Sequence, residues 1–203
     1  GETEHHANIV PWQQLESRLG VRVVPIPVDR TGMLDLESAK TLCAKHPVAV
    51  IAIGHVSNAI GALNDVEGFI ALANENKAFS VIDGAQAAPH MLVNVKNLQA
   101  DFYAMSAHKC CGPTGIGALF ARRELLERLP PWQGGGDMID RVSFSGTTYN
   151  ELPWKFEAGT PNIADTIGFS AALQYLESID FVAATAHESQ VHKYLVDSML
   201  SRN

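Results

Sequence analysis

A lysine and an aspartate stand at the ends of two strand-like segments, where their side chains can do chemistry. Lys109 follows the apolar run at residues 101–107 and precedes a glycine-rich loop at 112–117. An amine held between a strand end and a tight loop can lose hydration, as a lysine that forms a Schiff base must. Asp83 ends another apolar run, residues 79–83. Enzymes that use pyridoxal phosphate (PLP) pair such an acid with the pyridinium nitrogen, so a PLP site is the first hypothesis.

These residues also have ordinary structural interpretations. A lysine after a strand is usually a solvated charge, and an aspartate before a glycine often forms a turn. His5 and His6 are an exposed pair, a metal site or an aromatic ring packed on a flat cofactor. The chain has neither His-Glu-x-x-His nor Cys-x-x-Cys, so we expect no metal site.

Glycines and cysteines near these residues leave further alternatives. Residues 112–117 and 134–136 could cradle a phosphate through backbone amides, or they could be flexible turns. No Gly-Lys-Ser/Thr occurs, which excludes a Walker P-loop. The odd number of cysteines, three, argues against a disulfide framework, and reduced thiols are expected. For Cys110 and Cys111, beside Lys109, lining of the site is the simpler interpretation and a redox role the alternative.

Alternating strand-like and helical segments must position these side chains. Helical spacing is found at about residues 9–19, 34–45, 65–76, 123–129 and 164–203. Apolar or branched runs typical of strands lie at residues 21–28, 48–53, 79–83, 101–106 and 116–120. This order predicts an α/β fold with a largely parallel sheet and right-handed crossovers. Residues 132–161, rich in Gly, Ser, Thr and Pro, are expected to form a long excursion rather than another regular unit.

Polar groups follow three of the predicted strands. The segments are His55-Val56-Ser57-Asn58, Asp83-Gly84-Ala85-Gln86 and Ser106-Ala107-His108-Lys109. Because ligands of parallel sheets bind outside the carboxyl ends of the strands, we expect these segments to converge. Three converging strand ends support a site more strongly than either charged residue alone.

Composition narrows the possible partners. With 203 residues, 46% of them apolar, the chain can bury a sizeable core. The net charge of −7 and the scattered basic residues argue against a nucleic-acid partner. The longest apolar stretch, residues 47–54, is too short to span a bilayer, and nothing resembles a signal peptide, so the cytoplasm is the expected compartment.

Six segments in order carry the motifs of one known family. They are Glu4-His5-His6-Ala7-Asn8-Ile9-Val10-Pro11-Trp12, His55-Val56-Ser57-Asn58, Asp83-Gly84-Ala85-Gln86, Ser106-Ala107-His108-Lys109 with the loop 112–117, Gly134-Gly135-Gly136-Asp137-Met138-Ile139, and Phe156-Glu157-Ala158-Gly159-Thr160-Pro161-Asn162. The chain thereby resembles the group II cysteine desulfurases, of the CsdA and SufS type. These belong to the class V aminotransferase family of fold type I PLP enzymes and include selenocysteine lyases. The likeness extends from about residue 4 to at least residue 178.

The resemblance implies a fold and several residue roles. Residues 1–203 would be the three-layer α/β/α large domain, with a mainly parallel sheet and truncated at both ends; residues 164–203 would lead toward a C-terminal small domain that is absent. Lys109 would form the Schiff base with PLP and transfer protons, and His5 would stack on the pyridine ring. Asp83 would keep the ring nitrogen protonated.

Further roles concern the other groups of the cofactor. By the resemblance, Gln86 would contact the phenolic oxygen, Ser106 and His108 the phosphate, and Asn58 the substrate carboxylate region. Thr160 matches a threonine that reaches the phosphate of the partner subunit. A homodimer is therefore implied.

The implied reaction removes sulfur from L-cysteine, giving L-alanine and an enzyme persulfide whose sulfur passes to an acceptor protein. L-Selenocysteine would follow the same route, and iron-sulfur cluster assembly is one destination for the sulfur. In the family, the attacking cysteine lies in a C-terminal Arg-x-Gly-x-His-Cys type segment beside an arginine that binds the substrate carboxylate. Neither occurs here, nor does an N-terminal segment with another phosphate-binding threonine. We therefore assign no nucleophile among Cys43, Cys110 and Cys111, and we expect the isolated chain to be inactive.

Two alternatives stay open. Aminotransferases, kynureninases and epimerases share residues of the Asp83 and Lys109 type, so another class V PLP reaction is the first. The second is an inactive fragment that binds PLP, or one that only scaffolds a sulfur-acceptor partner. The Glu-His-His-Ala-Asn and Gly-Gly-Gly-x-Met-Ile segments favour the desulfurase.

Overall fold

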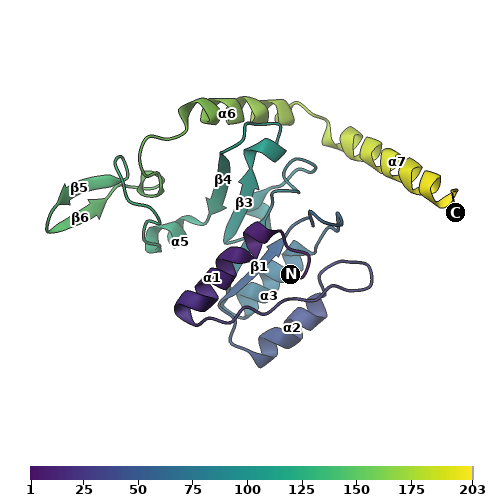
Figure 1. Ribbon diagram of the computed structural model, residues 1–203, viewed down its shortest axis with the longest axis horizontal. Helices are drawn as coiled ribbons and strands as arrows, with labels where there is room; N and C mark the ends of the chain where they lie inside the picture. Colours follow the sequence, from purple (N-terminus) through teal and green to yellow (C-terminus); the bar gives the residue numbers. More distant parts are fainter. Residues whose placement is uncertain (203) are drawn as a thin grey trace.

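A four-stranded sheet lies at the centre of the computed structural model, which describes residues 1–202 (Figure 1). Its strands are β1 (Val50–Gly54), β2 (Phe79–Asp83), β3 (Phe102–Ser106) and β4 (Gly117–Ala121), in that spatial order. The first three strands are parallel, and β4 runs antiparallel to β3. The predicted, mainly parallel sheet is confirmed.

One face of the sheet forms the main core. Strand residues alternate between the two faces, and Ile51, Ile53 and Ile82 point to the face that α3 (Val66–Glu75) covers. Phe69 of α3 packs in the same cluster and is fully buried. The neighbouring helix α2 (Leu36–Lys45) packs against α3 and completes this layer.

The first helix of the chain lies over the opposite face of the sheet and leaves an apolar groove there (Figure 1). Helix α1 (Val10–Leu19) follows the short 3-10 helix η1 (His6–Asn8), and its Trp12 lines an apolar groove with Val50, Val81 and Phe102 of the sheet. Helices therefore lie on both faces, and the predicted three-layer α/β/α arrangement is confirmed (Figure 1).

Short sequence signals set the ends of these helices. The Asp35 carboxylate accepts hydrogen bonds from the first backbone N–H groups of α2, and Asp65 does the same for α3. Such N-caps satisfy amides that have no partner inside the helix. Gly20 ends α1 in the left-handed conformation, with φ of 68°, which a residue without a Cβ adopts at little cost.

A buried carboxylate fastens the amino ends of β2 and β3. Asp101, 4% exposed, accepts hydrogen bonds from the backbone N–H and the hydroxyl of Ser80, at 2.9 and 3.2 Å. The Arg122 guanidinium, just after β4, lies 3.2 Å from the other Asp101 oxygen. Because a buried charge is costly unless it is paired, this cluster stabilises the order of the strands.

The predicted strand at residues 21–28 is wrong. This segment forms no ladder, and its one bridge joins Val28 to Leu34. Pro25 and Pro27 have no backbone N–H to donate, and Val21 is 46% exposed. The branched residues favour an extended chain, but no described strand lies beside it to pair with.

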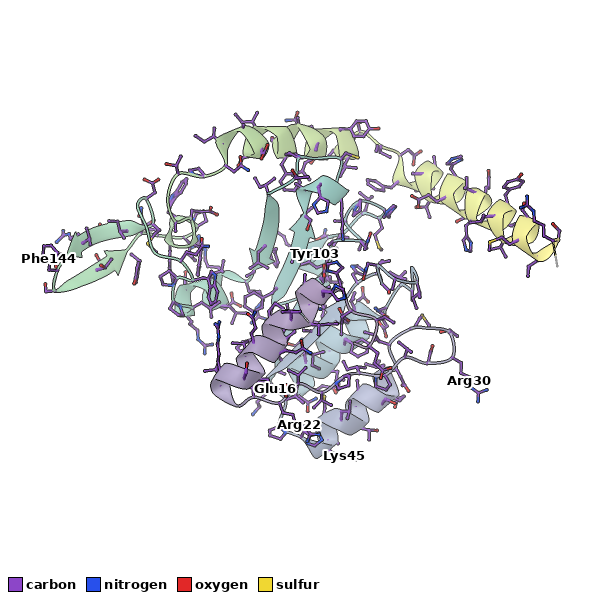
Figure 2. The ribbon with its side chains drawn as sticks, in the orientation of Figure 1. Glu16, Arg22, Arg30, Lys45, Tyr103 and Phe144 are labelled. Carbon is purple, nitrogen blue, oxygen red and sulfur yellow. The ribbon has the colours of Figure 1, made fainter. Side chains whose placement is uncertain are left out.

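The predicted excursion at residues 132–161 contains regular structure. Strands β5 (Ile139–Ser143) and β6 (Gly146–Tyr149) form an antiparallel hairpin that projects away from the sheet (Figure 1). Phe144 is fully exposed at its tip, as Figure 2 shows. The turn at Ser143–Gly146 connects the two strands, so the expectation of no regular unit is wrong for these residues.

Two helices close the chain, as the spacing in residues 164–203 predicts. Helix α6 (Ile163–Glu177) packs Phe169, Ala172 and Leu176 into a second core cluster. Helix α7 (Phe181–Leu200) extends away from the sheet (Figure 1). That residues 164–203 lead toward a small domain stays a prediction. In the described chain, no helix is both long and apolar enough to cross a membrane.

We predict that Phe69→Ala lowers the free energy of unfolding by about 3–5 kcal/mol, because it removes a fully buried aromatic ring from a close-packed core. The matched control is Tyr194→Ala on the exposed surface of α7, which we expect to change stability by less than about 0.5 kcal/mol. Urea denaturation followed by circular dichroism measures both, and equal losses would contradict the core assignment.

Candidate active site

The three polar strand ends meet in one pocket. It lies at the carboxyl edge of β1 and β2, between η1 and the 3-10 helix η2 (Ala107–Lys109) that follows β3. Its lining residues are Thr3, Glu4, His5, Gly54, Val56, Ser57, Asn58, Asn64, Asp83, Ala85, Gln86 and Lys109. The structure thus brings together Lys109, His5, Asn58, Asp83 and Gln86, which the sequence places far apart.

Asp83 enters the pocket because of the strand alternation. It lies on the same face of the sheet as Val81, the face that α1 covers. Its Oδ1 accepts a hydrogen bond of 3.0 Å from the backbone N–H of Ala85. Among the described residues no hydrogen-bond donor reaches Oδ2, so this oxygen can accept from a ligand in the pocket.

The backbone on either side fixes this aspartate. The N–H of His55 donates to the Asp83 carbonyl at 2.8 Å, and the N–H of Gly84 donates to the Ala104 carbonyl at 2.8 Å. These bonds continue the pairing of β2 with β1 and β3 beyond the last residue of β2. The turn that carries Asp83 is therefore an extension of the sheet rather than a free loop.

Hydrogen bonds and core packing of its neighbours fix the backbone at Lys109. The carbonyl of Ala107 accepts hydrogen bonds from the N–H groups of Cys110 and Gly112, at 2.8 and 2.9 Å. Cys110 has no exposed surface and packs against Phe169 in the second core cluster. The half-buried Lys109 side chain consequently starts from a rigid backbone and reaches the pocket.

His5 is oriented by a local hydrogen bond. It caps η1, and its Nδ1 accepts from the backbone N–H of Ala7 at 3.1 Å. This bond requires that Nδ1 carry no proton, so the neutral ring has its proton on Nε2. Beside it, the Glu4 carboxylate accepts from Asn8 at 2.8 Å and the Asn8 carbonyl oxygen accepts from Trp12 Nε1 at 3.0 Å, which connects the pocket to α1.

Three of the predicted cofactor residues do not line this pocket. Ser106 ends β3 and is half-buried, and His108 is exposed on η2. Thr160 is exposed in the segment between η3 (Trp154–Phe156) and α6. Their contacts with a phosphate, like the roles of the five pocket residues, stay predictions.

A buried pair behind the pocket was missed by the sequence analysis. The hydroxyl of Tyr103 and Nδ1 of His55 lie 3.0 Å apart, and the two residues are 3% and 6% exposed. Alternation along β3 is a signal that Tyr103 faces the core, but no spacing rule connects it to a histidine 48 positions away.

Burial shifts the protonation of this pair. It lowers the pKa of His55 and raises the pKa of Tyr103, the latter with help from the negative charge of Asp83. Both side chains are therefore neutral near pH 7. The structure places an uncharged hydrogen-bonded pair directly behind the carboxylate of the pocket.

Cys110, next to Lys109, is buried and therefore a poor nucleophile. Burial raises the pKa of Cys110, and Cys111 adds to this shift, so Cys110 stays a thiol. All three cysteines are free. Within residues 1–202, no group of three or more His, Cys, Asp and Glu side chains is placed to hold a metal ion.

Fold and pocket together define a class of protein. A three-layer α/β/α domain with a lysine and an aspartate from neighbouring strand ends in one pocket is the arrangement of a PLP-dependent enzyme domain of fold type I. A model of the family described as aminotransferase class-V matches residues 1–203. The chain belongs to the class-V aminotransferase family, whose members are PLP-dependent.

Similar proteins are cysteine desulfurases. The chain is 45% identical over 192 residues to a probable cysteine desulfurase of Vibrio cholerae serotype O1, covering 95% of this chain and 47% of that protein. The crystal structure of the Escherichia coli cysteine desulfurase CsdA matches with a TM-score of 0.91 and 40% identity, over 99% of this chain and 50% of that one. An apo cysteine desulfurase from Thermococcus onnurineus NA1 gives the same TM-score and identity, over 98% and 49%.

The chain spans about half the length of the relatives that it matches. Its own pocket nevertheless has the groups that PLP needs. An amine, an imidazole and side-chain amides line it, and Asp83 Oδ2 has no described protein donor. Gly54 leaves room beside the Glu4 carboxylate, because an added Cβ there would lie 3.3 Å from a carboxylate oxygen. The residues present fit the cofactor.

We predict that His55 makes stability depend on pH. Because burial lowers the pKa of folded His55 below its usual 6.5, the unfolded state binds more protons at this residue. Its contribution is therefore fully present above about pH 6.5 and is lost as the pH falls through the lowered pKa of the folded state.

Urea unfolding between about pH 5 and about pH 7.5 tests this dependence. We expect His55→Gln to flatten the dependence of the unfolding free energy on pH, while His187→Gln, on the exposed face of α7, follows the wild type. Parallel curves for His55→Gln and the wild type would contradict the assignment.

Proposed function

We propose that this chain is the PLP-binding part of a cysteine desulfurase. In that reaction the carbon–sulfur bond of L-cysteine breaks, the sulfur passes to the thiol of an enzyme cysteine as a persulfide, and L-alanine is released. L-Selenocysteine is a second substrate by the same chemistry. The proposal rests chiefly on the convergence of Lys109, Asp83 and His5 in one pocket of a chain 40–45% identical to cysteine desulfurases.

Each pocket residue has a defined task in this proposal. Bound PLP supplies an electron-accepting ring that stabilises negative charge on the substrate carbon. Asp83 Oδ2 holds a proton at the ring nitrogen and thereby keeps the ring electron-poor. Lys109 Nζ binds the cofactor and moves protons, and His5 covers one face of the ring. Gln86 and Asn58 orient the phenolic oxygen and the substrate carboxylate region.

The phosphate is proposed to lie next to this pocket. His108 precedes Lys109 on η2 and Ser106 is the residue just before η2, so both would meet a phosphate that extends from the pocket edge. Thr160 would serve the partner subunit of a homodimer. The exposed hairpin β5–β6 supports this dimer, because the Phe144 ring at its tip has no partner among the described residues.

The nucleophilic thiol is proposed to lie outside this chain. Among the described lining residues of the pocket there is no cysteine, and Cys110 is buried with a raised pKa. We therefore expect the 203-residue chain to bind PLP without transferring sulfur by itself. The persulfide would deliver its sulfur to an acceptor protein, and the three free thiols suit a reducing cytoplasm.

We predict that Lys109→Ala abolishes covalent attachment of PLP. The wild-type protein with added PLP should show a visible absorption band, and borohydride should fix the cofactor on the peptide that contains Lys109. Lys45→Ala, an exposed lysine at the end of α2, is the control and should behave as the wild type. A label spread over surface lysines would overturn the assignment.

The products distinguish the reaction from its relatives. In the protein at its natural length, a desulfurase gives alanine and sulfide from L-cysteine, whereas an aminotransferase gives a keto acid. Production of a keto acid would keep the PLP site and reject the desulfurase.

We predict that Phe144→Glu weakens the proposed homodimer by about tenfold or more, because it replaces the exposed apolar ring at the hairpin tip with a charge. Leu19→Glu, an equally drastic change on exposed surface at the end of α1, is the control and should leave the dimer intact. Light scattering after gel filtration measures the dimer fraction. A dimer unaffected by Phe144→Glu would place the interface elsewhere.

A further inference from the structure

We infer that Tyr103 and His55 are positioning residues for Asp83: their buried hydrogen bond holds the strand-end turn that aims the aspartate at the ring nitrogen. This inference rests on the proposed function, since it assigns Asp83 to that nitrogen. It adds residues that do not line the pocket and whose side chains touch neither cofactor nor substrate.

Two hydrogen bonds of His55 connect the His55–Tyr103 pair with Asp83. Through its backbone N–H, His55 donates to the Asp83 carbonyl at 2.8 Å, and through Nδ1 it is 3.0 Å from the hydroxyl of Tyr103. One residue is thereby bonded to both the aspartate and the tyrosine. His55 thus connects the Tyr103 hydroxyl to the backbone of the last residue of β2.

The tyrosine ring also packs directly on the turn. An added Cβ at Gly84 would overlap the Tyr103 ring and hydroxyl, so glycine is required there for the ring to reach this position. Gly84 is the residue after Asp83, and its N–H donates to Ala104, the residue after Tyr103. The turn is therefore enclosed by Tyr103 on its core side and by the paired strands on its flanks.

The His55–Tyr103 pair is neutral, so it can lie next to the Asp83 turn without pairing with the Asp83 charge. The rings of His55 and Tyr103 meet edge to face, with centroids 6.0 Å apart. Each side chain gives the other a hydrogen-bond partner inside a low-dielectric core, where an unpaired polar group is costly. A cation in place of this pair would compete with the ring nitrogen for the Asp83 carboxylate, whereas a neutral pair fixes the turn and leaves that charge available.

The test is a double-mutant cycle on the PLP-loaded protein. Tyr103→Phe keeps the ring on Gly84 and removes only the hydroxyl. We expect it to weaken PLP binding about three- to tenfold, by leaving buried His55 without its partner, and to shift the pH dependence of the visible absorption band. Tyr194→Phe, on exposed α7, is the matched control and should match the wild type.

The second arm of the cycle uses Asp83→Asn. If Tyr103 acts through Asp83, then Tyr103→Phe should have little further effect on PLP affinity in this background. An equal effect in both backgrounds overturns the positioning role while leaving the PLP site in place. Failure of the wild type to bind PLP overturns the proposed function and this inference together.

A conservative variant separates positioning from simple stability. His55→Gln keeps a side-chain amide that can donate to or accept from the Tyr103 hydroxyl, and we expect it to retain PLP affinity better than His55→Leu, which has no polar group. Binding is measured at a temperature where all variants are folded, as circular dichroism verifies. Equal PLP affinity for wild type, His55→Gln and His55→Leu contradicts the inference.

Discussion

The parallel register of three strands is the constraint on which the site depends. Gly54, Asp83 and Ala104 are partners across β1, β2 and β3, so the chain leaves the sheet at nearly the same level in each strand. Parallel strands need long crossovers, and the residues that follow each strand are therefore distant in sequence but adjacent in space. A pocket at this edge receives one polar segment from each strand without any loop having to reach across the molecule.

Two aspartates of the same sheet show how position decides the role of a carboxylate. At the amino edge, Asp101 is buried and both of its oxygens have protein partners, Ser80 and Arg122. At the carboxyl edge, Asp83 accepts a hydrogen bond within its own turn through Oδ1, and its carboxylate lines the pocket. The Asp101 charge is paired within the fold, whereas Asp83 Oδ2 has no donor among the described residues and can accept from a ligand.

The sequence predicted much of this arrangement, and its failures have physical causes. Lys109 and Asp83 could be found because a strand end followed by a glycine-rich turn is a local pattern. The mainly parallel sheet followed from alternation of helix and strand periods. The segment at residues 21–28 was misjudged because β-propensity describes a residue's fit to a sheet and says nothing about whether a neighbouring strand is present. The contact of His55 with Tyr103 could not be predicted, since it depends on the three-dimensional path of the chain.

Strand ends and core packing fix Asp83 and the backbone at Lys109, whereas Asn58 lies on an exposed turn. Asp83 and Lys109 follow backbone that strand pairing and the core cluster around Cys110 hold in place. With the roles proposed for them, these two residues would serve any reaction that begins with an electron-accepting ring. None of these supports selects a substrate. Selection must come from groups that meet the substrate on the open side of the pocket, of which the described chain offers Asn58 on an exposed turn. In the proposed site, a change on the open side would alter the substrate without disturbing Asp83 and Lys109, as a fold that hosts several PLP reactions requires.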